Sequence, residues 1–168
     1  MKKRDVENFV EAWGAMGALM GFSASTARVH ALLIASDQGL CLDDIVDGLG
    51  ISRGNASMCL KELRSWGVVS RAGKTAGDRR DYFETESDIW KMAYTIASER
   101  KRRDFEPALR GLEEVLGQVS GKGPAEARLA EMGEFLAVMK RIADHLLGNE
   151  AAAKQLILML GGTKGSDE

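Results

Sequence analysis

Apolar residues recur at steps of three and four along most of this chain, and only two prolines are present to interrupt that spacing. Such steps place side chains on one face of an α-helix, whereas proline bends or ends helices. The spacing therefore predicts a mainly helical fold, with one exception between residues 68 and 84. There, two short β-like runs flank a glycine-rich polar loop, which predicts a hairpin.

Four helical patterns precede this hairpin. The first ends at Gly21, and the second is apolar almost all round, which predicts a buried central helix. The third spans residues 42–49, with Cys41 at the position where a capping serine is expected. Ser52 caps the fourth pattern, which ends at Trp66.

Helical spacing resumes after residue 87. Pro107 predicts a kink, and Pro124 suits the first turn of a further helix. Glycines inside the helical patterns, such as Gly17, Gly111 and Gly133, predict close helix crossings. We expect a domain over residues 1–86, a helical linker and dimerisation region over 87–161, and a flexible tail over 162–168.

A heptad pattern of nearly three repeats lies within the helix that begins at Pro124. Its members follow steps of three and four: Leu129, Met132, Leu136, Met139, Ala143 and Leu146. We interpret this face as the interface of a homodimer, and packing within one chain is the alternative. The charge run at 99–104 predicts a solvated surface with ion pairs one turn apart, and auxiliary phosphate contact is its alternative.

Composition excludes several classes of function. The chain has 168 residues, of which 45% are apolar and 29% charged, as in ordinary folded domains. No apolar run reaches the roughly 18 residues that span a membrane, and no signal peptide begins the sequence. We therefore expect a cytoplasmic protein with no membrane partner.

Chemistry-bearing residues are few. Cys41 and Cys59 cannot form a disulfide scaffold, and packing is favoured over a redox pair. His30 and His145 lack the spacing of metal ligands, so we expect no metal and no cofactor. No phosphate-binding loop, nucleophile elbow or zinc-protease motif is present, so an enzyme is not expected.

The order helix, glycine turn, helix and glycine-rich hairpin is that of a winged helix-turn-helix domain. Gly50 supplies the turn. The fourth helix has an apolar face for the core and a short polar face near its N-terminus. We expect DNA contacts from this helix and the hairpin, at Ser52, Arg53, Gly54, Asn55, Ser57, Met58, Lys61, Arg64, Arg71, Lys74, Thr75, Arg79 and Arg80.

The distribution of charge supports this expectation. Residues 52–80 carry seven Lys and Arg against two Asp and Glu, a net charge of +5. Because the whole chain has a net charge of −2, the remaining residues carry −7. A local basic surface on an acidic protein is typical of phosphate contact.

These segments resemble a known family. The sequences LDDIVDGLGISRGNASMCLKELRSWGVVSR and GDRRDYFETESDIW are similar to the winged helix-turn-helix of MarR-type transcriptional regulators. The pair Trp13-Gly14 and the later ERKRR place the resemblance closest to the GbsR branch. It implies a bacterial homodimeric repressor on a palindromic double-stranded operator, with the fourth helix in the major groove and the wing in the minor groove.

Members of the GbsR branch control choline and glycine betaine genes, so the resemblance implies a quaternary amine as effector. Aromatic rings cage such cations, and Trp90, Tyr94 and Phe105 are the candidate ligand residues, with core packing as their alternative. Two other functions remain open: a winged-helix module that binds proteins, and an osmolyte or amine sensor that does not act on DNA.

Overall fold

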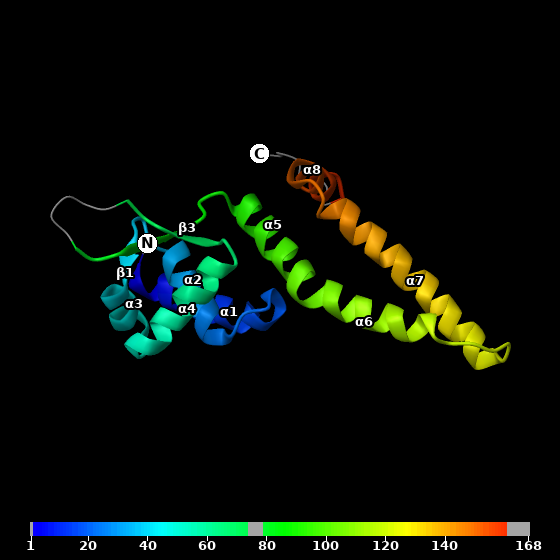
Figure 1. The fold of residues 1–168 in the computed structure, drawn as a ribbon. Coiled ribbons are helices and arrows are strands. Elements are labelled where there is room, and N and C mark those ends of the chain that lie inside the picture. Colours follow the sequence, from blue (N-terminus) through cyan, green and yellow to red (C-terminus); the bar gives the residue numbers. More distant parts are fainter. Residues whose placement is uncertain (1, 74–78, 161–168) are drawn as a thin grey trace. The chain divides into compact units, whose positions relative to one another are not determined.

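The computed structural model of the protein describes residues 2–73 and 79–160, and the chain divides into two compact units, residues 1–96 and 97–168. The chain is mainly helical, with one small antiparallel sheet (Figure 1). The first unit extends past the expected boundary at residue 86, because Met92 and Ile96 belong to its core.

The first unit contains the predicted helices and hairpin in the predicted order. Its elements are α1 (Lys3–Met20), α2 (Ala24–Ile34), β1 (Leu40–Cys41), α3 (Leu42–Leu49), α4 (Arg53–Ser65), β2 (Val69–Arg71), β3 (Tyr82–Thr85) and most of α5 (Ile89–Arg100).

Local hydrogen bonds explain where these helices begin and end. Ser23 Oγ accepts the Thr26 N–H at 3.1 Å at the start of α2, and Ser52 Oγ accepts the Asn55 N–H at 3.2 Å at the start of α4. Gly50 ends α3 with φ of 62°, a left-handed conformation that glycine adopts without strain. The tight turn between α3 and α4 therefore follows from the sequence.

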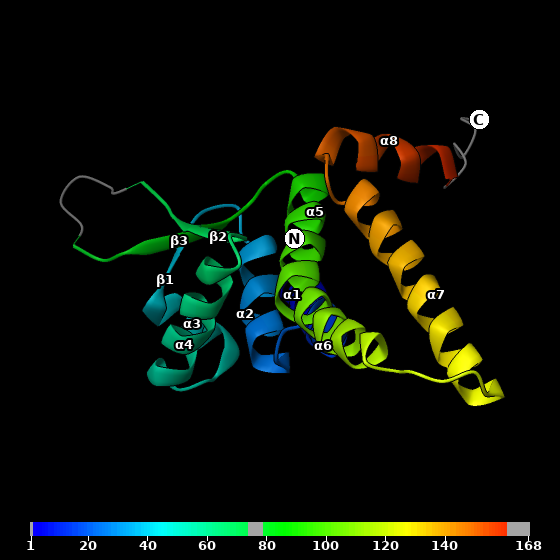
Figure 2. The ribbon, with the colours of Figure 1, turned by 45° about the vertical axis from the view of Figure 1, so that its right-hand side comes forward.

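Helix α2 is the central helix of the first unit, as its composition predicted. It lies between α1 on one side and α3 with α4 on the other (Figure 2). Ala27, Val29 and Ala31 are fully buried. Helix α1 crosses it closely at Gly17, where an added Cβ would lie 2.8 Å from the Cβ of Ala27.

The sheet has one strand more than the sequence predicted. Strand order is β1-β3-β2, with both pairs antiparallel. Phe83 in the middle strand pairs with Leu40 on one side and with Arg71 on the other. The hairpin is therefore attached to the residues immediately before α3, which links it to the helix-turn-helix.

The second unit consists of the end of α5 followed by η1 (Lys101–Phe105), α6 (Glu106–Gly117), α7 (Pro124–Leu146) and α8 (Glu150–Leu160). A π-helical turn, η1, occupies the place where Pro107 predicted a kink, and the Glu106 N–H donates to the Lys101 carbonyl. Gly111 has no atom within 4 Å of an added Cβ, so the expected close crossing there was wrong.

The charge run at 99–104 forms ion pairs, as the surface interpretation predicted. Glu99 accepts hydrogen bonds from Arg102 and Arg103, and those from Arg102 are the main reason its pKa is lowered. Lys101 joins η1 to α7 through Asp144 at 2.7 Å and also contacts Glu106. These contacts link η1 to α6 and α7 within the second unit.

None of the helices in the described parts of the chain combines the length and apolar character needed to cross a membrane. Within residues 2–73 and 79–160, no three His, Cys, Asp or Glu side chains gather as metal ligands would.

Candidate nucleic-acid interface

Helix α4 has the two faces that a DNA-contacting helix requires. Its inner face is buried in the core through Ala56, Cys59, Leu60 and Leu63. Its opposite face is exposed, and Met58 retains 73% of its accessible surface. Helix α4 is also hydrogen-bonded to α2, because Thr26 of α2 donates a 2.5 Å hydrogen bond to Glu62.

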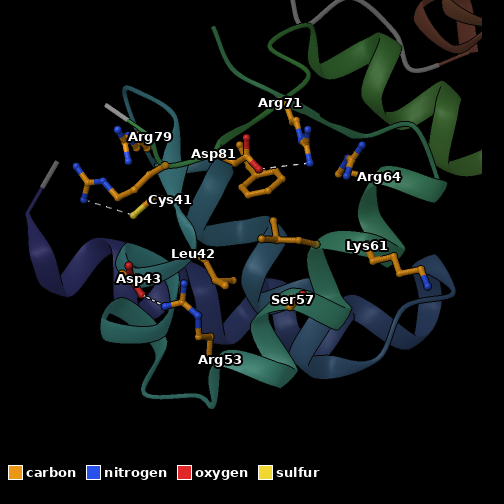
Figure 3. A pocket seen from close by; sticks show the side chains of 13 residues that line it. Cys41, Leu42, Asp43, Arg53, Ser57, Lys61, Arg64, Arg71, Arg79 and Asp81 are labelled. Atoms are coloured by element: carbon orange, nitrogen blue, oxygen red, sulfur yellow. Dashed lines mark hydrogen bonds and ion pairs between the residues drawn. The ribbon is translucent and has the colours of Figure 1, made fainter. Parts of the chain in front are cut away.

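The exposed face of α4 and the base of the hairpin enclose an open hollow of about 600 Å³ (Figure 3). Six cationic side chains line it, together with the carboxylates of Asp43 and Asp81. Three of the cations come from α4 and three from the hairpin strands or their ends: Arg53, Lys61, Arg64, Arg71, Arg79 and Arg80. The structure thus brings together six cations that lie up to 27 positions apart in the sequence, from Arg53 to Arg80.

The two carboxylates in the hollow each pair with an arginine. Asp43 of α3 accepts a hydrogen bond from Arg53 Nη1, and Asp81 lies 3.3 Å from Arg71 (Figure 3). The sequence analysis missed both acids. Asp43 precedes Arg53 by ten residues, and only the tight turn at Gly50 suggests that the starts of α3 and α4 lie near each other.

Arg80 connects the hairpin to the start of α3. Its guanidinium lies 5.4 Å from the ring centre of Tyr82, and its Nη1 donates to Cys41 Sγ at 3.9 Å. Cys41 is buried and occupies the N-cap position of α3, as its place in the sequence predicted. These contacts hold the arginine at the rim of the hollow.

Of the other candidate DNA contacts on or next to α4, Ser57 also lines this hollow, whereas Ser52, Gly54, Asn55 and Met58 lie outside its lining. Ser52 and Gly54 are exposed at the start of the helix. Asn55 is half-buried, and its amide oxygen accepts a 3.4 Å hydrogen bond from the Cys59 thiol. Burial raises the pKa of this thiol. Two further candidates, Lys74 and Thr75, lie outside the described residues.

The aromatic residues proposed for ligand binding remain a prediction. Trp90 and Tyr94 lie one turn apart on α5, and Phe105 ends η1. Trp90 and Phe105 are 38% and 37% exposed. A further aromatic residue, Phe22, is buried in the core against Trp66.

The candidate dimer residues lie on a helix that is poorly covered. Leu129, Met132 and Met139 are exposed, and Leu136, Ala143 and Leu146 are half-buried. Sequence reasoning missed three more exposed apolar residues on α7, namely Phe135, Val138 and Ile142. Their steps of three and four could have revealed them, since they widen the same apolar face.

Comparison with known proteins supports the fold alone. No protein-family profile matches the chain, and no curated protein matches it. A solved crystal structure of a transcriptional regulator is similar, with a TM-score of 0.59 and 24% sequence identity. The similarity covers 86% of this chain and 96% of that one, so it extends over both units.

Proposed function

We propose that this protein is a sequence-specific double-stranded DNA-binding transcriptional regulator, a homodimer that acts as a repressor. One observation carries the proposal. Six cations of α4 and the hairpin surround a single open hollow on a chain whose net charge is −2. Phosphate contact is the function that such a local basic surface serves best.

The proposed interface makes two kinds of contact, one that gives affinity and one that gives sequence specificity. Arginine and lysine side chains around the hollow bind phosphates and fix the position of α4 on the duplex. Exposed residues near the N-terminus of α4, among them Arg53 and Ser57, then contact base edges in the major groove. We expect the hairpin to contact the neighbouring minor groove.

A second copy of the chain is the proposed partner of α7. This helix has no buried residue, although six of its large apolar side chains are exposed. Covering them in a symmetric pair removes apolar surface from water and sets the separation of two α4 helices on a palindromic operator. Residues 1–86 would thus bind DNA, and residues 87–161 would link and dimerise the protomers.

The fold of the similar transcriptional regulator and the motifs shared with MarR-type proteins support the same function. Assignment to the GbsR branch rests on the quoted motifs, and so does a quaternary amine as effector. The proposed ligand contacts are Trp90, Tyr94 and Phe105.

Binding of duplex DNA across a salt series tests the proposal. We first expect selection from a random pool to yield a palindromic site. Affinity for that site should fall steeply with salt, with a log–log slope of about −0.9 for each phosphate contact. Arg79→Ala should make the slope shallower, whereas Arg53→Ala should relax the preference at one base pair in each half-site.

Lys122→Ala is the matched control, because it removes an exposed cation from the segment between α6 and α7. It should change neither the slope nor the base preference. Unchanged duplex binding by both arginine variants would contradict the proposed function and favour a protein-binding module instead.

A further inference from the structure

We propose that Asp43 is a positioning residue that sets base preference by orienting the Arg53 side chain. The inference rests on the proposed DNA-binding function and deepens it. Asp43 belongs to α3 rather than to the helix expected to contact bases. Its carboxylate nevertheless meets the guanidinium at the first residue of α4 (Figure 3).

The backbone at Asp43 lies between two residues that are buried in the core. Asp43 is the second residue of α3, between the buried Cys41 and the fully buried Ile45. The Cys41 N–H donates to Asp44 Oδ2 at 2.8 Å, which fixes the first turn of the helix. The backbone that carries Asp43 is therefore well ordered, and its short side chain presents an acceptor to a long side chain that would otherwise sample many rotamers.

The hydrogen bond leaves donors for a second partner. A guanidinium carries five N–H groups in a planar fork, and Asp43 Oδ1 engages Nη1. Contact with a guanine requires only two of these groups, on O6 and N7. Asp43 and a base can thus bind the same arginine at once.

Neither stability nor general affinity accounts for this ion pair. The two side chains are 66% and 54% exposed, and pairs in that setting contribute little to the free energy of unfolding. A carboxylate in a basic hollow also weakens the attraction for phosphates. Orientation of Arg53 is the remaining effect, and it bears on specificity.

The test compares two variants with the same charge change on the same helix. Asp43→Asn removes the ion pair, and Asp47→Asn removes another exposed carboxylate of α3. The affinity of each protein is then measured for a set of duplexes. These duplexes differ only at the base pair where Arg53→Ala loses its preference. Ordering of one long side chain predicts a loss of roughly 3- to 10-fold in that preference for Asp43→Asn.

The control Asp47→Asn should keep the wild-type base preference. When Arg53→Ala is already present, adding Asp43→Asn should reduce the base preference no further. Uniformly tighter binding by Asp43→Asn, with its base preference unchanged, would overturn the inference while leaving DNA binding intact. Absence of duplex binding by the wild-type protein at low salt would overturn the proposed function as well.

Discussion

At the scale of single residues, His30 is the ionisable group that burial affects most clearly. The side chain is fully buried in α2, between the rings of Trp13 and Phe22, and its Nε2 lies 3.1 Å from Thr85 Oγ1. Its Nδ1 has no hydrogen-bond partner among the described residues. Desolvation lowers its pKa from 6.5 to about 4, because the protonated ring cannot be solvated there.

This shift predicts a loss of stability in mild acid. The unfolded state binds the proton below pH 6.5, and the folded state binds it only near pH 4. The free energy of unfolding should therefore fall as pH decreases between these values, by about 2 to 3 kcal/mol at pH 4.5. Urea unfolding at pH 7.5 and pH 4.5 measures the change.

His30→Gln serves as the reference, because it removes the titrating ring but keeps a polar side chain. The wild-type protein should lose more stability between the two pH values than this variant loses. Equal losses would mean that His30 does not titrate between the folded and unfolded states as its burial implies.

Individual residues were predictable where the backbone decides their role. Ser52 and Cys41 were recognised at cap positions because a cap needs only its neighbours along the chain. Contacts between residues that are distant in sequence could not be predicted in this way. Asp43 was missed because its contact with Arg53 depends on how α3 and α4 cross. Asn55 has its amide oxygen on Cys59, one turn further along α4, a rotamer choice that spacing does not specify.

At the scale of elements, the crossing of α1 and α2 depends on Gly17. An added Cβ would lie 2.8 Å from Ala27 Cβ and 3.2 Å from the Ser23 carbonyl. Alanine normally stabilises a helix by about 1 kcal/mol relative to glycine. At Gly17 the clash should outweigh this gain, so Gly17→Ala is expected to lower the unfolding free energy by about 1 to 2 kcal/mol.

The same substitution in α4 provides the comparison. Gly54 lies in a helix of the same unit, and nothing is within 4 Å of its added Cβ. Gly54→Ala should therefore leave stability unchanged or raise it by a few tenths of a kcal/mol. Thermal unfolding of both variants measures whether each substitution lowers or raises stability. A more stable Gly17→Ala protein would show that α1 can move away from α2.

Helix boundaries were predictable because glycines, prolines and caps mark them. The range of α3 agrees with the prediction, and Pro124 begins α7 as expected. Strand β1 was not predicted, since two residues carry no periodicity and the pairing of Leu40 with Phe83 is distant in sequence. A kink near Pro107 was expected, but the apolar spacing carried no signal for the π-helical form of the turn before it.

At the scale of the whole molecule, the second unit has little core of its own. Leu109 is its one buried apolar residue on α6, and none of the residues of α7 is buried. The apolar side chains of α7 form a wide face that includes the heptad positions and Phe135, Val138 and Ile142. Helices with this pattern usually bury the face against another element, which supports the proposed dimer.

Dimerisation through α7 predicts a sharp effect of one introduced charge. Met139 lies on the heptad face and is 39% exposed in the single chain. In Met139→Glu a carboxylate would be buried without a partner, which costs several kcal/mol and should raise the dimer dissociation constant at least 100-fold. Sedimentation should then give the mass of one 18.2 kDa chain.

Arg141→Glu tests whether position rather than charge is responsible. It introduces the same carboxylate two residues further along α7, at an exposed position on the side of the helix away from the heptad face. This variant should sediment as a dimer and bind a palindromic duplex as the wild-type protein does. Met139→Glu should bind that duplex weakly, because each protomer would have to occupy its half-site alone. If both variants remained dimeric, the interface would lie elsewhere on the chain, and the heptad face would require another partner.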